Sequence, residues 1–457
     1  MKNNRSFSTD ADGAILRFKY YTLLFFLFMS PFAFSSFVNR VSPVLPTATL
    51  LLLATTYVFG LFLLRTKKLF LVPSERVVLI GLFLPFLFSI PLVGANFLFH
   101  ADSAYALYVS MKLPGRLANA VFFFSLFVLA MSFIGEYRSR PPESFARWYF
   151  AGTAVLVFFG IWQWLHNYLN VPMFDLDTRS YMFGLRQNGF SYLVDRIRLT
   201  SLLDEPNFLV AFLIDGLLLG PLLVTSRRYY AFGVVAPFLF VLLFSFSAGG
   251  YLNLLLLCGV VLLTPGFLPA KIKKKAVAIT IAALFLAGTI FYQQIFEFLF
   301  PILGRLDSLF NQTSTRIYMM VSTLRAAWDD PLPFMIFGHG PGSVFYLNFK
   351  GLPMATSNSM YLDLFYETGL FGLLAALWMF SRLLKENISF GWTRDPRVRW
   401  IYLLICHLAI TSTYRADFFS SRFWSILILV LAFHHSFREG TSSSIATSEE
   451  RRSPKPL

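Results

Sequence analysis

The chain has 457 residues, of which 56% are hydrophobic and only 14% are charged. This composition excludes an ordinary water-soluble protein, which needs more charge to cover its surface. The formal net charge of +15 would indicate nucleic-acid binding in a soluble protein, but in a membrane protein basic residues gather in the cytoplasmic loops. We therefore expect an all-α polytopic membrane protein that binds no nucleic acid.

Apolar runs long enough to cross the hydrocarbon core recur along the chain. They predict about twelve transmembrane helices, at 20–38, 46–64, 77–93, 118–134, 148–168, 208–226, 229–246, 249–265, 276–298, 359–381, 400–414 and 423–437. No small-residue cleavage site follows the first run, so we expect a retained helix rather than a removed signal peptide. Cys258 and Cys406 both fall inside apolar runs, and two such cysteines predict neither a disulfide framework nor a metal site.

The distribution of basic residues predicts the sidedness. With a cytoplasmic N-terminus, the inside segments carry 26 of the 39 Lys and Arg residues and the outside loops carry 13. The positive-inside rule therefore places both termini in the cytoplasm. Eleven of the 13 outside residues are Arg, and the planar guanidinium group suits bidentate contact with phosphate.

Two outside segments, about 169–207 and 299–358, are long, whereas the other connections are short. Function is therefore expected in these two periplasmic loops, which we predict to carry short helices. The predicted organisation is a polytopic membrane domain over residues 1–438 and a disordered cytoplasmic tail over 439–457, which is low in apolar residues.

The first long loop ends in "DRIRLTSLLDEPNFLVAFLIDG" (195–216). Arg196 and Arg198 precede a helix start at which Pro206 suits the first turn and acidic residues suit the positive end of the helix dipole. Capping explains Asp204 and Glu205 in structural terms. A second interpretation is that Glu205 is a base beside arginines that hold phosphate.

Asp215 lies deeper in the same predicted helix. A carboxylate inside the membrane is costly unless it is paired. We expect an arginine partner, with Arg415 and Arg422 as the candidates.

The second long loop contains "GHGPGS" (338–343). It resembles a phosphate-binding loop, but it lacks the Lys-Ser/Thr pair and the preceding strand that a nucleotide-binding P-loop requires. It also faces away from the cytoplasm and its nucleotides. Either it is a tight turn in which glycine supplies positive φ, or its amides and His339 lie near a lipid-linked phosphate.

Charged residues flank this loop on both sides. Arg316 and Arg325 are nine residues apart, which places them on opposite faces of a helix. Asp363 and Glu367 are four residues apart and share one helix face. These two carboxylates mark either a solvated helix entrance or a general base and an arginine partner.

The pattern resembles the O-antigen ligase and O-antigen polymerase superfamily of bacterial envelope glycosyltransferases. The stretches "GHGPGSVFYL" and "SNSMYLDLFYETGLFGLL" are similar to its Gly-x-Gly-x loop, Asn-x-x-Tyr/Phe-Leu motif and Glu-x-Gly-hydrophobic-x-Gly motif. "RIRLTSLLDEPNFLVAF" is similar to its arginine-bearing segment, and "SFSAGGYLNLLL" to its Ser-Arg-Gly-Gly turn.

The resemblance implies an enzyme of the bacterial inner membrane that takes glycan from undecaprenyl diphosphate on the periplasmic face, without metal, cofactor or nucleotide. Polymerases pass the glycan to another lipid-linked repeat unit and ligases pass it to lipid A–core. It implies the lipid bilayer, a chain-length regulator and a flippase as further partners.

Two departures favour the polymerase over the ligase. The chain has Ser357 where ligases carry a histidine, and Ala248 where they carry an arginine. The Glu205-Pro206 pair is also more similar to the polymerases. A ligase remains the first alternative, followed by a polysaccharide transporter and a structural protein of an envelope complex.

On this hypothesis, arginines bind the diphosphate and a base takes the proton of the acceptor hydroxyl. The expected diphosphate-binding residues are Arg198 and Arg316, then Arg196 and Arg415. Glu205 and His339 are the expected catalytic residues.

Overall fold

A computed structural model represents the whole chain. The residues described below are 10–34, 73–99, 103–136, 141–173, 186–187, 190–193, 196–224, 226–264, 267, 315–349, 356–391, 395–416, 418 and 420–450.

The described residues are predominantly helical. The elements before residue 200 are α1 (Asp10–Met29), η1 (Ser30–Phe34), α4 (Pro73–Val78), η2 (Leu79–Phe83), α5 (Leu84–Phe99), α6 (Ser103–Met111), α7 (Leu113–Glu136), α8 (Glu143–Leu169), β1 (Arg186–Gln187), β2 (Phe190–Leu193) and β3 (Arg196–Arg198). Those after it are α10 (Pro206–Leu223), α11 (Arg227–Tyr230), η3 (Ala231–Val235), α12 (Ala236–Phe244), α13 (Ala248–Leu263), α16 (Thr315–Trp328), α17 (Leu332–Phe337), η4 (Ser343–Phe345), α18 (Tyr346–Phe349), α19 (Met360–Ser389), α20 (Arg397–Thr411) and α21 (Ser421–Glu450).

Helices occupy ten of the twelve predicted spans, and the predicted spans 46–64 and 276–298 lie outside the described residues. Four helical stretches of the described residues are long and apolar enough to cross a membrane: Ser74–Ala95, Glu143–Leu169, Pro206–Leu223 and Met360–Ser389. Shorter apolar helices lie at Tyr20–Ala33, Leu113–Val128, Arg228–Phe244 and Gly249–Leu263. The helical membrane class is thus supported, while the number of spans stays a prediction.

Two long helices contain a π-helical turn just before a proline. The η2 turn precedes Pro85 and the η3 turn precedes Pro237. Proline has no N–H, and its ring crowds the carbonyl four residues earlier, so the regular hydrogen-bond ladder cannot continue through it. In both helices that earlier position is glycine, Gly81 and Gly233. The wider turn absorbs the proline without ending the helix.

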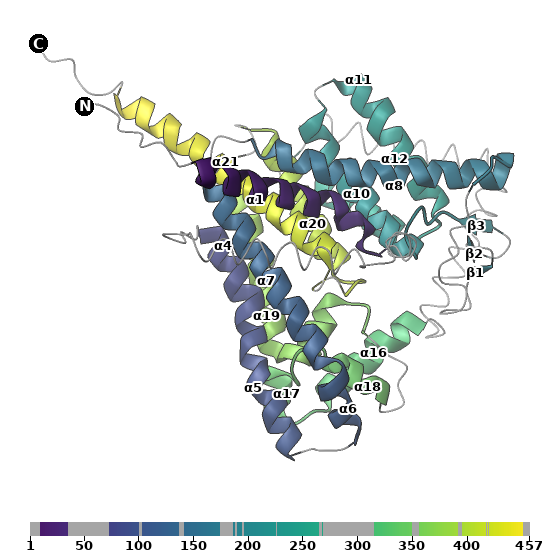
Figure 1. Ribbon diagram of the computed structural model, residues 1–457, viewed down its shortest axis with the longest axis vertical. Helices are drawn as coiled ribbons and strands as arrows, with labels where there is room; N and C mark the ends of the chain where they lie inside the picture. The colour runs from purple at the N-terminus through teal and green to yellow at the C-terminus, as the bar shows by residue number, and fades with distance from the viewer. Residues whose placement is uncertain are drawn as a thin grey trace, which may run out of the picture.

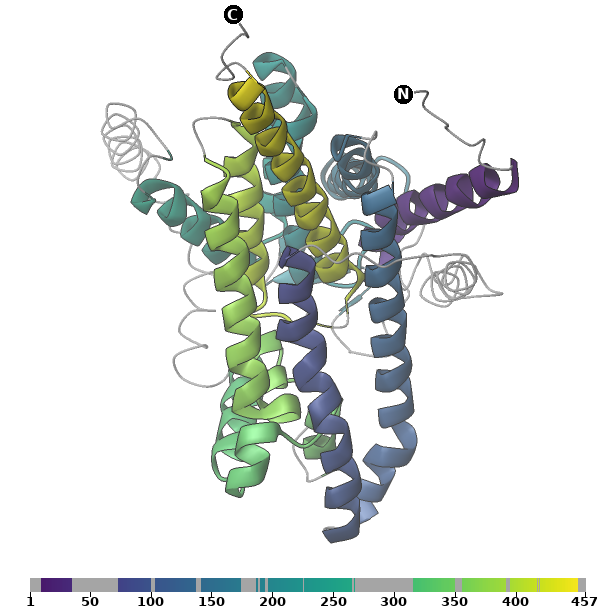
Figure 2. The ribbon, with the colours of Figure 1, turned by 90° about the vertical axis from the view of Figure 1, so that its left-hand side faces the viewer.

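The helices form two connected groups. Figure 1 shows α5, α7 and α19 running steeply, with α6, α16, α17 and α18 near the ends of these helices, while α8 and α1 cross the upper part. In the upper part α10 packs against α8, α12 and α20, and α13 packs against α20. Figure 2 shows α5 between α19 and α7 in the turned view, and α19 also packs on α5, α20, α16 and α17. Helix α19 therefore connects the two groups.

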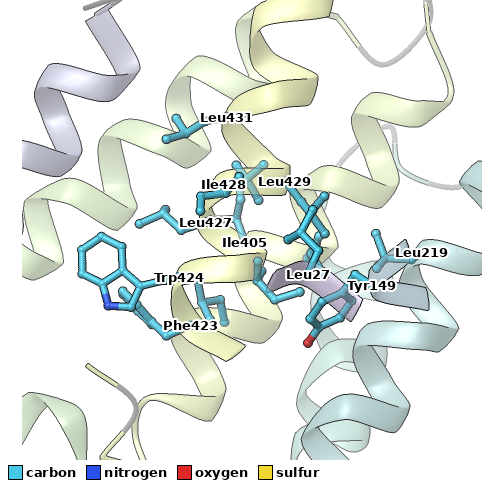
Figure 3. Packing of buried hydrophobic residues seen from close by; sticks show 14 of the residues in the cluster. Leu27, Tyr149, Leu219, Ile405, Phe423, Trp424, Leu427, Ile428, Leu429 and Leu431 are labelled. Carbon is cyan, nitrogen blue, oxygen red and sulfur yellow. The ribbon is translucent and has the colours of Figure 1, made fainter. Parts of the chain in front are cut away.

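The core is centred on α21, whose residues Phe423–Phe433 are nearly all buried. Trp424 stacks on Phe123 of α7 with ring centroids 5.7 Å apart, and its indole N–H donates to the Phe418 carbonyl at 2.8 Å. Figure 3 shows Phe423, Trp424 and Leu427 in this packing. A helix that is apolar on all sides suits a position surrounded by other helices.

Two expectations outside the bundle need correction. In the first long loop, the described residues form the antiparallel sheet β1-β2-β3 rather than short helices. The segments "FSYL" and "RIR" are too short for their hydrophobic pattern to distinguish a strand from a helix. Helix α21 continues to Glu450, into the tail predicted to be disordered. Proline would end a helix, but the tail contains no proline before Pro454.

Candidate functional site

The glycine-rich loop lies directly on the first turns of α19. The amide of His339 donates to the Tyr366 carbonyl at 3.0 Å, and the amide of Gly340 donates to the Glu367 carbonyl at 2.9 Å. Gly338 and Gly369 both have positive φ, at 78° and 69°. A Cβ on Gly338 would lie 2.3 Å from the Glu367 backbone, and one on Gly369 would lie 2.1 Å from the Ile336 carbonyl oxygen. Only glycine allows the two backbones to approach this closely.

His339 is held from three sides. Its Nε2 lies 2.6 Å from Oδ2 of Asp330, and its ring stacks between Phe334, at 4.8 Å, and Tyr366, at 4.7 Å. The side chain is 11% exposed. A carboxylate on one ring nitrogen fixes the tautomer, so that the other nitrogen of the neutral ring carries the lone pair. His339 therefore packs between two aromatic rings and, through Asp330, also has the geometry of an oriented base.

Two carboxylates of α19 lie beside the same loop. The carboxylate of Glu367 accepts a backbone hydrogen bond from Gly342, and Oδ1 of Asp363 accepts the Ser357 amide at 2.8 Å. Arg116 of α7 interacts electrostatically with both carboxylates, and its side chain lies where a Cβ on Gly342 would be, with Cγ at 2.4 Å. Arg116 is one of the 13 basic residues expected in the outside loops, and only the tertiary contacts place it beside these carboxylates.

An aromatic cluster supports the other side of the loop. The hydroxyl of Tyr108 donates to the Pro341 carbonyl at 2.7 Å, and Tyr105 packs edge-on against Tyr346 of α18. Burial, with a contribution from Glu367, raises the pKa of the Tyr108 phenol far above its usual range. Tyr108 therefore stays neutral and serves as a hydrogen-bond donor that fixes the Pro341 turn.

Arg198 and Glu205 lie on either side of a tightly held turn. Gln163 of α8 accepts the amides of Thr200 and Ser201 through Oε1, both at 2.9 Å. Arg198, the last residue of β3, is 6% exposed. Glu205 is the N-cap residue of α10 and its side chain makes no capping hydrogen bond, while Pro206 begins the helix as predicted. Gln163, which the sequence analysis did not single out, fixes the turn between them.

Arg415 lies in the α20–α21 link and contacts the start of α10. Its guanidinium carbon is 4.9 Å from the Phe208 ring centroid, and its Nη1 donates to the Phe208 carbonyl at 3.5 Å. The Met360 amide donates to the Arg415 carbonyl at 2.9 Å. Met360 and Tyr366, which bonds His339, are therefore about 9 Å apart along α19, at 1.5 Å per residue.

The structure confirms the expected partner of Asp215. Arg422 binds both carboxylate oxygens, through Nε at 2.7 Å and Nη2 at 2.9 Å. The Tyr149 hydroxyl donates to Oδ2 at 2.7 Å, and Nε2 of His407 lies 3.2 Å from Oδ1. Asp215, Arg422 and His407 are completely buried. A bidentate, hydrogen-bonded pair is the arrangement in which a membrane carboxylate can remain charged.

The structure thus brings Arg415 next to Phe208, three residues after Glu205, while His339 bonds to Tyr366, six residues along α19 from the Met360 that bonds to Arg415. Arg196 and Arg316 lie in β3 and α16, and their side chains are outside the described part. Among the described residues, no group of three or more His, Cys, Asp and Glu side chains is arranged to hold a metal ion.

A helical membrane protein with a glycine-rich loop on a kinked helix is the class that these features define. Residues 233–377 match the family described as O-antigen ligase, and this match supports membership of the O-antigen ligase/polymerase superfamily, whose members are glycosyltransferase-like enzymes. The matched segment includes His339, Arg316 and Glu367, whereas Arg196, Arg198, Glu205 and Arg415 lie outside it. No curated protein matches the chain.

Proposed function

We propose that the chain is a bacterial inner-membrane polymerase that joins undecaprenyl-diphosphate-linked oligosaccharide repeat units on the periplasmic face. The observation that carries the proposal is the docking of the glycine-rich loop on α19, with His339 and Asp330 2.6 Å apart, inside the segment that matches the O-antigen ligase family. The repeat unit belongs to an O-antigen or to an exopolysaccharide.

The reaction requires that the protein bind the diphosphate leaving group and stabilise its negative charge. The acceptor hydroxyl attacks the anomeric carbon of the donor glycan, the bond from that carbon to the phosphate oxygen breaks, and undecaprenyl diphosphate leaves. Fixed guanidinium groups stabilise the charge on this leaving group when water is excluded. Arg198 and Arg415, both buried to 6% or less exposure, are the supported candidates. Arg196 and Arg316 remain candidates on sequence position alone.

The proton of the acceptor hydroxyl needs a base. His339 fits this role because Asp330 orients its ring and stabilises the protonated imidazole. Glu205, the N-cap residue at the start of α10, stays the competing base. A single attack of this kind inverts the anomeric centre.

The ligase is the alternative, with lipid A–core as acceptor. Ser357, at the position of the ligase histidine, has a local structural role here. Its hydroxyl donates to the Ser359 carbonyl at 2.9 Å and accepts the Ser359 amide at 3.1 Å. Ala248 follows the N-cap Ser247 of α13. These roles support the polymerase. Transport is disfavoured, because the ionisable group deep in α10 is fully paired.

Surface glycan from a deletion strain tests the proposal. A polymerase deletion leaves single repeat units on the carrier or on lipid A–core, and the plasmid-borne gene restores the polymer. Full-length polymer retained on undecaprenyl diphosphate would instead identify a ligase. Unchanged surface glycan would contradict both functions.

A further inference from the structure

A continuous polar network runs through the buried part of the bundle. From the Asp215–Arg422 pair, Nη2 of Arg422 lies 2.8 Å from Nε2 of His407, and Nδ1 of His407 lies 3.0 Å from Oδ1 of Asn253. Nδ2 of Asn253 then donates to the Tyr414 hydroxyl at 2.9 Å. The next residue in the chain is Arg415. The network therefore connects α10, α21, α20 and α13 to the link that carries this arginine.

Three residues on one face of α10 contact this region. Phe208, Ala211 and Asp215 are spaced by three and four residues, which places them on the same face of a helix. Phe208 lies under the Arg415 guanidinium group, the Ala211 carbonyl lies 3.2 Å from Nε2 of His407, and Asp215 binds Arg422. A rotation or shift of α10 by one residue would break all three contacts.

The α20–α21 link is held at both ends. The Asn253 amide also donates to Oγ1 of Thr411 at 3.0 Å, at the end of α20. Arg422 lies one residue into α21. The described backbone between them, including Arg415, accepts the amide of Met360 at the start of α19. The position of Arg415 is thus set by hydrogen bonds whose direction fixes the register.

We propose that the network of Tyr149, Asp215, Arg422, His407, Asn253 and Tyr414 is a positioning element for Arg415, and so for binding of the lipid diphosphate. The proposal rests on the role of Arg415 given above. Packing of apolar side chains holds these helices together, and the directional hydrogen bonds add a further constraint on the axial register of one helix against another. Tyr414 is the positioning residue nearest to Arg415.

The test compares two variants that each remove one phenol hydroxyl. Tyr414→Phe removes the bond to Asn253. Tyr361→Phe is the matched control, because its hydroxyl donates at 3.1 Å to the Ala409 carbonyl of α20, which is not a member of the network. Purified full chain in nanodiscs is assayed with an undecaprenyl-diphosphate-linked repeat unit, and the melting temperature of each variant is measured.

Tyr414→Phe is expected to raise KM for the lipid-linked donor about fivefold, which corresponds to about 1 kcal/mol, with little change in kcat. Tyr361→Phe is expected to lower the melting temperature comparably without changing KM. Equal KM values in the two variants would overturn the proposal.

Arg415→Ala separates this inference from the function on which it rests. A large rise in KM for Arg415→Ala together with an unchanged KM for Tyr414→Phe rejects the network alone. An unchanged KM for Arg415→Ala rejects the diphosphate role of Arg415 itself. A rise in both Arg415→Ala and Tyr414→Phe, with Tyr361→Phe unchanged, supports both.

Discussion

The single histidine of the glycine-rich loop has two physical roles at once. Its ring fills the space between Phe334 and Tyr366, and its Nε2 binds Asp330. Truncation to alanine would remove both roles and could unfold the loop for reasons unrelated to chemistry. A variant that keeps the ring separates them.

His339→Phe is therefore expected to keep the stacked packing and lose the base. Loss of general-base catalysis lowers activity roughly 10²–10⁴-fold. Ser357→Ala is the control, since it removes a local turn contact worth about 1 kcal/mol. Polymer length on gels, normalised to protein level in the membrane, is the measurement. Normal-length polymer from both His339→Phe and Glu205→Gln would show that neither residue is the base.

Arg198 gives a second prediction for a single residue. Arg198→Lys is expected to lower activity nearly as much as Arg198→Ala, because an ammonium group cannot reproduce the bidentate fork of a guanidinium. The same gel and protein-level assays apply. Full activity of the lysine variant would mean that only the positive charge matters at this position.

At the level of elements, the crossing of the loop with α19 depends on two glycines. Gly369 adopts φ 69° and ψ −172° inside α19, a conformation that is essentially open only to glycine. The kink there lets the chain before the loop, at Ile336, approach the helix backbone. The glycine-rich sequence thus serves backbone contact rather than nucleotide binding.

Gly369→Ala should destabilise the fold by about 2 kcal/mol or more, from backbone strain and overlap with the Ile336 carbonyl. Gly259→Ala in α13 is the matched control, because nothing lies within 4 Å of the added Cβ. That change should be neutral or stabilise by about 0.5–1 kcal/mol. Thermal unfolding in detergent measures both, and equal melting temperatures would argue against the crossing.

The Asp215–Arg422 pair joins α10 to α21 and gives a prediction about stability. Arg422→Met leaves the Asp215 carboxylate buried without its main partner, which costs about 3–5 kcal/mol. The double variant Asp215→Leu/Arg422→Met should recover most of this loss, since apolar pairs of similar volume replace buried ion pairs well. A double variant less stable than Arg422→Met alone would contradict this account.

At the scale of the whole molecule, the fold brings together segments that are far apart in the sequence. Arg415 contacts Phe208 across 207 positions, and Tyr108 binds Pro341 across 233. Both predicted periplasmic loops lie on the same side of the membrane if the sidedness derived from the basic residues holds.

Sidedness is tested with tags for membrane-impermeant labelling. Tags after Gln187 and after Gly351 should be labelled from the periplasm, whereas tags at Lys274 and at the C-terminus should not. The reason is the split of 26 basic residues inside against 13 outside. Labelling of the Gly351 tag from the cytoplasm alone would reverse the orientation and remove the site from the periplasm.

The sequence by itself determined the helical membrane class, the presence of helix at ten of the predicted spans, the start of α10 at Pro206 and the need of Asp215 for an arginine. These follow from local periodicity, proline chemistry and the cost of a buried charge. Only the tertiary structure decided that Arg422 rather than Arg415 is that partner, that Asp330 orients His339, and that Arg116 and Gln163 support the site. These contacts join separate helices, and their geometry depends on helix packing, which a pattern along one chain does not encode.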